Sequence, residues 1–146
     1  MSEITSNIRK VTKVVEHSIT QLDKNAEKTR DEMMSALIQL AKEEVNKKRQ
    51  VVGTTRSGNK IYAKAEPDKP PQKRTGTLQR SITGKKDREG FGTYTAVVGP
   101  GIIYGRRLEL GGGNWKQGIK FPYMQPAFKK FKPIASQIIA RNLRIK

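Results

Sequence analysis

The sequence predicts an α+β protein with a long N-terminal helix, a small antiparallel β-sheet carrying a long basic loop, and a C-terminal helix packed on the sheet. Three observations lead to this prediction. Apolar residues recur every three or four positions over residues 3–50, which is the period of a helix. Residues 51–76 are rich in Gly and Pro. Residues 77–146 then combine a run of β-forming residues with a second apolar stripe at helical spacing.

The chain divides into an N-terminal helical arm, residues 1–50, and an α+β domain, residues 51–146. A total of 146 residues suits one domain with an extended arm. A helix over residues 3–50 would be about 70 Å long, against roughly 30 Å for a small domain. Part of it must therefore leave the globule, bend back on it, or pack on a neighbouring subunit. Apolar residues thin out around Asp23–Arg30, which leaves a break or kink open there.

Residues 51–76 read as a long, basic loop. Within it, Gly53–Lys60 suits a hairpin tip or a mobile arm, and Lys60–Ala63 suits a short strand. Loops of this length inside a compact domain are usually functional, or become ordered on binding.

The last part of the chain predicts short elements followed by a helix. Thr77–Thr83 suits a short helix or a strand, and Gly92–Gly99 alternates as a strand does. In residues 108–110 two leucines flank a glutamate, again in alternation. The final helix begins near Pro126, and its apolar face consists of Phe128, Phe131, Ile134, Ile138 and Leu143.

The charge is strongly positive and unevenly distributed. Thirty Lys and Arg residues face thirteen Asp and Glu residues, a net charge of +17. Net charge rises from +2 over residues 1–50 to +6 over 51–90 and +9 over 91–146, where Glu109 is the sole acid. So many like charges repel one another and destabilise the folded chain, unless a polyanion lies beside them. The most common such polyanion is nucleic acid. The alternative is that the charge aids solubility or complements an acidic neighbouring subunit.

The residue inventory argues against an enzyme. There is no Cys, and His17 is the only His, so thiol chemistry, a His-based triad and a multi-histidine metal site are excluded within one chain. The glycine runs do not match phosphate-binding loops. The acids outside the N-terminal helix are scattered, at Glu66, Asp68, Asp87, Glu89 and Glu109. We therefore predict no catalytic residues, no metal and no cofactor. The chain also lacks the roughly 20-residue apolar run that a bilayer span needs.

Three segments carry a family resemblance. Arg74–Ile82 contains the pattern TG-x-L-x-x-SI, and Val97–Gly111 contains a strand, a Tyr-Gly turn and a hydrophobic-Glu-x-Gly stretch. Phe121–Phe128 contains Pro-aromatic-x-x-Pro-Ala-aromatic at the start of the last helix. In this order, over about residues 70–131 and behind a long charged helix, they resemble the neck or tail-completion proteins of long-tailed bacteriophages.

The resemblance implies a structural virion protein of the phage neck. It would form part of the head-to-tail connector ring that joins the DNA-filled capsid to the tail and surrounds the DNA channel. The implied partners are further copies in a ring, six-fold in the family, head-completion or portal-side proteins, tail-terminator or tail-tube proteins, and packaged double-stranded DNA. The implied location is the head–tail junction of the virion, after assembly in the host bacterial cytoplasm. The alternative is a free, sequence-independent nucleic-acid-binding protein.

Two sets of candidate site residues follow. The predicted DNA-facing residues are Lys73, Arg74, Arg80, Lys85, Lys86, Lys116 and Lys120. The predicted subunit-interface residues are Tyr104, Arg106, Arg107, Glu109, Trp115 and Tyr123. We expect Glu109 to pair with an arginine, either Arg106 or Arg107 or one of an adjacent subunit, with an intrachain structural pair as an equal alternative.

Overall fold

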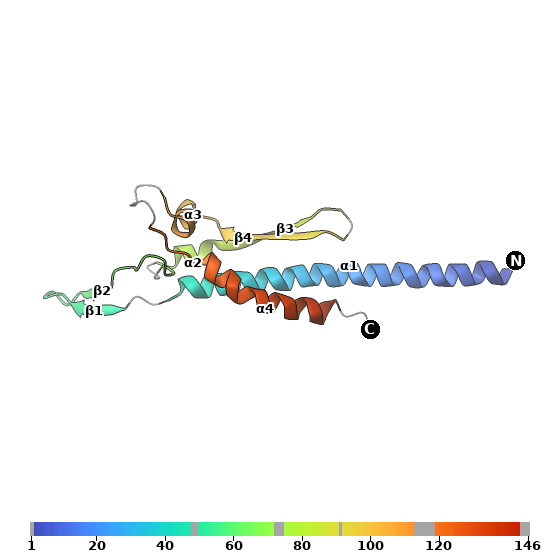
Figure 1. The fold of residues 1–146 in the computed structure, drawn as a ribbon, viewed down its shortest axis with the longest axis horizontal. Helices are drawn as coiled ribbons and strands as arrows, with labels where there is room; N and C mark the ends of the chain where they lie inside the picture. The colour runs from blue at the N-terminus through green and yellow to red at the C-terminus, as the bar shows by residue number, and fades with distance from the viewer. Residues whose placement is uncertain (1, 48–49, 72–74, 91, 113–118, 144–146) are drawn as a thin grey trace.

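The structure, a computed structural model, describes residues 2–47, 50–71, 75–90, 92–112 and 119–143. It is α+β, as predicted. The elements in chain order are α1 Ser2–Val45, β1 Val51–Thr54, β2 Lys60–Tyr62, α2 Thr77–Ser81, β3 Ile82–Arg88, β4 Tyr94–Pro100, α3 Ile103–Leu110 and α4 Met124–Asn142. Figure 1 shows the β3–β4 hairpin and α4 lying along the C-terminal half of α1, whose N-terminal half projects alone. The β1–β2 hairpin projects from the opposite end of the molecule.

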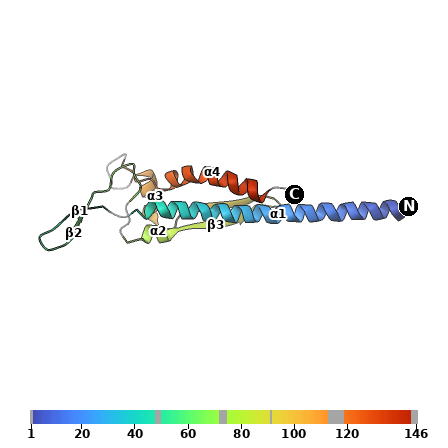
Figure 2. The ribbon, with the colours of Figure 1, turned by 90° about the horizontal axis from the view of Figure 1, so that it is seen from below.

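α1 is one uninterrupted helix of 44 residues, about 66 Å long. The break considered at Asp23–Arg30 does not occur. No Gly or Pro precedes Gly53, and Arg30 binds the carboxylates of Glu27 and Asp31 on its own helix. Of the three arrangements that the sequence left open, α1 leaves the globule. Residues 8–22 are exposed, and Figures 1 and 2 show the N-terminal half of the helix projecting alone.

The core lies where the second half of α1 meets β3, β4 and α4. Its fully buried cluster joins residues from distant parts of the chain, namely Ala41, Val45, Ile82, Tyr123 and Ala127. Partly buried apolar residues of α1, α2, β4, α3 and α4 pack against it. In Figure 2, α4 lies on one side of α1 while α2 and β3 lie on the other. The C-terminal half of the long helix is therefore part of the same core as the α+β domain.

Two separate antiparallel hairpins replace the single small sheet. β1 and β2 confirm the hairpin tip expected at Gly53–Lys60 and the short strand expected at Lys60–Ala63. β4 confirms the strand expected at Gly92–Gly99, one to two residues further on. β3 was not predicted as a strand beyond Thr83. It pairs with β4 from Ile82 opposite Pro100 to Arg88 opposite Tyr94.

Residues 103–110 form the helix α3, so the alternation noted in residues 108–110 does not mark a strand. In a strand, Leu108 and Leu110 would face the same side. Here Leu108 packs against the core, while Leu110 is 65% exposed. Leu108 and Leu110 therefore do not lie on one face, although they alternate with Glu109 in the sequence.

α4 confirms the predicted C-terminal helix, and it begins two residues before Pro126. Phe131 and Ile138 of the predicted apolar face are buried, whereas Phe128 and Leu143 stay largely exposed. The sequence stripe is thus only partly covered by the chain itself.

Gly105→Ala should destabilise the protein. A Cβ at this position would lie 2.5 Å from Cβ and 2.6 Å from Cγ of Pro100, whose ring cannot rotate away. This overpacking outweighs the roughly 1 kcal/mol that Ala gains over Gly in a helix, and we expect the free energy of unfolding to fall by about 1–3 kcal/mol. Urea denaturation followed by circular dichroism measures it.

Gly99→Ala is the matched control for this prediction. No atom lies within 4 Å of a Cβ built there, so its effect should stay within about 0.5 kcal/mol. Equal stability of the two variants would contradict the packing described around Gly105.

Candidate functional site

The predicted DNA-facing residues are spread over several elements. Those that lie outside the described part of the chain are Lys73, Arg74 and Lys116. Three others have exposed side chains: Arg80 on α2, Lys85 on β3 and Lys120 in the segment before α4. No contact between these three side chains is seen, so the structure does not join them into one cluster.

Lys85 and Lys86 point in opposite directions from β3. Even-numbered residues of this strand face α1, because a Cβ on Gly84 would collide with Met34 of α1. Lys86 accordingly donates to a carboxylate oxygen of Asp31 at 2.6 Å, and this hydrogen bond lowers the pKa of Asp31. Lys86 thus attaches the hairpin to α1, whereas Lys85 faces outward.

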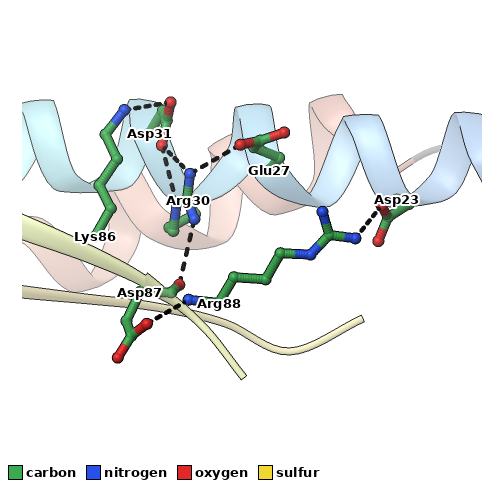
Figure 3. Close-up of polar contacts among 7 residues, drawn as sticks. All are labelled: Asp23, Glu27, Arg30, Asp31, Lys86, Asp87 and Arg88. Atoms are coloured by element: carbon green, nitrogen blue, oxygen red, sulfur yellow. Dashed lines mark hydrogen bonds and ion pairs between the residues drawn. The ribbon is translucent and has the colours of Figure 1, made fainter. Parts of the chain in front are cut away.

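A row of polar contacts holds the β3–β4 hairpin on α1 (Figure 3). Besides the Lys86–Asp31 pair, Arg88 donates to Asp23 at 2.8 Å, about two helical turns nearer the free end of α1. The guanidinium of Arg88 also lies 5.3 Å from the centre of the Tyr94 ring. These contacts reach the far end of the hairpin, which explains why the hairpin runs along the helix instead of splaying away.

Arg30 is the most enclosed residue of this row. Its side chain is only 9% exposed, and it contacts Glu27 at 3.3 Å and Asp31 at 2.9 Å on its own helix. It also donates to the main-chain carbonyl of Asp87 at 3.3 Å and lies 5.2 Å from the centre of the Tyr94 ring. A buried guanidinium needs such partners to offset its desolvation. Arg30 therefore serves the fold and is not available to a phosphate.

Two ion pairs fix α4 against α1 in antiparallel orientation. Near the C-terminal end of α1, the buried carboxylate of Glu44 contacts Lys130 of α4 and also Lys47 at 2.9 Å. Burial raises the pKa of Glu44, but the hydrogen bonds from Lys130 and Lys47 together outweigh it and hold that pKa below its ordinary value. At the other end, Arg141 donates to Glu32 at 2.6 Å.

Glu109 closes the N-terminus of α4. One of its carboxylate oxygens accepts from the backbone N–H of Tyr123 at 2.7 Å and of Met124 at 2.9 Å. The other accepts from the N–H of Gln125 at 2.9 Å. The first N–H groups of a helix have no partner within the helix, and Tyr123 at the N-cap position supplies no side-chain cap. A carboxylate from α3 therefore does the work of a capping residue, aided by the helix dipole.

The expectation that Glu109 pairs with Arg106 or Arg107 is therefore wrong. Both arginines are exposed on α3, and no ion pair joins either of them to Glu109 within the part of the chain that the structure describes. The capping role of Glu109 could not be predicted from the sequence, because its three partners are backbone N–H groups, which any residue type supplies.

The other predicted interface residues divide between surface and core. Tyr104 is 42% exposed on α3, beside the exposed Arg106 and Arg107. Tyr123 is fully buried, and its hydroxyl donates to the Gly105 carbonyl at 3.3 Å. Burial raises the pKa of Tyr123 well above its usual range. The structure thus places Tyr123 in the interior of its own subunit instead of on a contact surface. Trp115 lies outside the described residues.

The three sequence segments that carry the family resemblance meet in one place. The N–H of Gly101 donates to the carbonyl of Ser81 at 2.7 Å, which joins the first segment to the second. The N–H of Phe121 donates to the carbonyl of Leu108 at 2.7 Å, which joins the second to the third. Glu109 adds its cap across the same junction. The motif residues therefore build one packed junction of α2, β4, α3 and α4.

In residues 2–47, 50–71, 75–90, 92–112 and 119–143, no three His, Cys, Asp or Glu side chains are grouped so that they could hold a metal ion. His17 is exposed on the projecting half of α1. None of the described helices combines the length and the apolar character that crossing a membrane requires.

Comparison of the chain with family models, with curated proteins and with solved structures gives no match.

Glu109→Gln should destabilise the protein. The amide keeps the size of the side chain, but it loses the charge at the helix N-terminus and replaces one accepting oxygen by a donor facing an N–H group. We expect the free energy of unfolding to fall by about 1–3 kcal/mol. Chemical denaturation of the purified protein measures this.

Glu89→Gln is the matched control. Glu89 is exposed beyond the end of β3, and the substitution changes the net charge by the same amount. Its effect should stay within about 0.5 kcal/mol. A loss of equal size in both variants would mean that overall charge repulsion, and not the cap, accounts for the effect of Glu109.

Proposed function

We propose that this protein is a structural component of the phage neck, one subunit of the head-to-tail connector ring that surrounds the DNA channel. The observation that carries the proposal is the convergence of the three motif segments. Residues far apart in the sequence, and singled out there by resemblance alone, form one junction held by backbone hydrogen bonds and by the Glu109 cap.

The shape of the chain supports an assembly role. A small core carries a long helix that projects at one end and a two-stranded hairpin that projects at the other (Figure 1). The hairpin leaves Val51, Val52 and Ile61 largely exposed, and the projecting helix does the same with its apolar residues. Exposed apolar surface on extended segments is typical of contacts with other chains.

The charge of the chain supports a position beside DNA. If each of the thirteen acids neutralised one base, seventeen of the thirty Lys and Arg residues would still have no acidic partner within the chain. Several acids are in fact used to hold the fold together, among them Asp31, Glu44 and Glu109. The surplus cations suit a channel through which phosphates pass without regard to sequence.

Disruption of the gene in the phage that encodes it tests the proposal. Electron microscopy of the lysate should show DNA-filled heads beside complete, unattached tails, because the joint between them is missing. Supplying the wild-type gene from a plasmid should restore joined particles, which controls for effects on neighbouring genes. Normal infectious particles from the disrupted phage would contradict the neck function.

The net charge also favours the alternative, a free nucleic-acid-binding protein, and the two functions differ in solution. A free binder would hold duplex DNA tightly as an isolated protein, with an affinity that falls steeply with salt. A neck subunit should bind DNA weakly and without sequence preference until the ring presents many cations together. Fluorescence anisotropy with a labelled duplex, over a salt series, separates them.

A further inference from the structure

The projecting half of α1 carries an apolar stripe that none of the described residues covers. We call it the arm stripe; its residues are Ile8, Val11, Val15, Ile19 and Leu22. They remain 60%, 63%, 49%, 42% and 40% exposed. With about 100° between successive residues, they fall within an arc of about 80° on one side of the helix. Arg9, Lys10 and Lys13 lie on the opposite half, so burying the stripe would remove no charge from water.

The chain also contains an apolar groove, which we call the α1–α4 groove. It is an open cavity of about 410 Å³ between α1, β4 and α4. α1 contributes Met33 and Leu37, β4 contributes Ala96 and Val98, and α4 contributes Phe131 and Ile139. Phe128 and Leu143, the residues of the α4 stripe that stay largely exposed, also line it.

The arm stripe and the groove belong to one continuous surface of α1. Ala26, Met33 and Leu37, which line the groove, fall on the same arc of α1 as the arm stripe. The arm stripe therefore continues the apolar face of the groove along α1 toward the N-terminus. Because α1 is a single unbroken helix, the arm of a chain cannot fold back into its own groove. No described segment of the chain covers either surface, so we look for the cover in another molecule.

A second copy of this chain fits both surfaces. The arm stripe from Ile8 to Leu22 is about 21 Å long, and the groove follows α1 from Ala26 to Leu37, about 16 Å. Every copy carries one arm and one groove, so a single repeated contact covers both surfaces in every subunit of a ring whose rotation closes.

We propose that the arm stripe of one copy packs into the α1–α4 groove of a second copy. This interface deepens the proposed function and rests on its homo-oligomeric ring, for which it supplies the repeated contact. The arm enters as a helix whose apolar side faces the groove and whose basic side stays in solvent. One arm and one groove per chain then link each subunit to the next.

Cysteine cross-linking tests the contact directly, because the natural chain has no Cys. One full-length variant carries Val15→Cys on the arm stripe, and a second, with a tag of different size, carries Ala96→Cys in the groove. Mixing them with a short bismaleimide should yield a covalent species of summed mass. Lys13→Cys in place of Val15→Cys is the control on the opposite side of the arm, and it should give at least ten-fold less product. Equal yields from Val15→Cys and Lys13→Cys would overturn the proposal.

A matched pair of charge variants tests whether the contact holds the assembly together. Val15→Glu and Gln21→Glu change the net charge equally on exposed positions of the same helix, but only Val15 lies on the arm stripe. By light scattering, wild type and Gln21→Glu should share an oligomeric mass, and Val15→Glu should fall to the 16.4 kDa of a single chain. A monomeric wild type, or an oligomer that Val15→Glu leaves intact, would overturn the proposal.

The failure of this interface is distinguishable from the failure of the neck function. Unattached heads and tails after gene disruption, together with an oligomer that withstands Val15→Glu, would reject the arm contact while leaving the neck function in place. Normal particles after disruption, together with specific arm–groove cross-links, would reject the neck function and leave the self-association standing.

Discussion

The apolar face of α1 between Ala26 and Val45 supports the rest of the structure. The β3–β4 hairpin and α4 have little core of their own, and each acquires one by packing on this face. Ion pairs at the margins then fix their positions: Lys86 and Arg88 hold the hairpin, and the Glu44–Lys130 pair holds α4. Because these two elements cover only the second half of a 44-residue helix, the same face is left in solvent over residues 8–22. The exposed surface of the molecule is thus a direct consequence of how its core is built.

The few acidic side chains hold the fold together, although the net charge of the chain is strongly positive. Asp23, Asp31 and Glu44 each bind a base from another part of the chain, and Glu109 caps α4 with its two oxygens. Since acids are few, their use inside the fold leaves a surface dominated by Lys and Arg. The same arrangement that secures the fold therefore produces the cationic exterior on which the proposed contact with DNA depends.

The periodicity of apolar residues was sufficient to predict the helices and strands that bury an apolar face. α1, β4 and α4 follow from their patterns, and the hairpin tip at Gly53–Lys60 follows from its turn residues. β3 was not predicted as a strand beyond Thr83, because its residues there are Gly or charged. On the face toward α1, Gly84 allows close approach, and Lys86 and Arg88 form ion pairs where apolar residues would be expected. α3 was not predicted, because the two leucines that flank Glu109 show the alternation of a strand. The arm stripe was visible in the sequence, but the groove was not, since its lining comes from α1, β4 and α4 together.

Hydrogen–deuterium exchange of the wild-type protein, followed by mass spectrometry, tests the central claim most directly. A helical segment without tertiary contacts opens readily and exchanges fast, whereas one packed on a partner is protected. If the arm stripe is covered by a second copy, amides of residues 8–22 should be protected about as strongly as those of residues 33–45 and should lose that protection on dilution. Fast exchange over residues 8–22 at every concentration, beside a protected segment 33–45, would contradict the account.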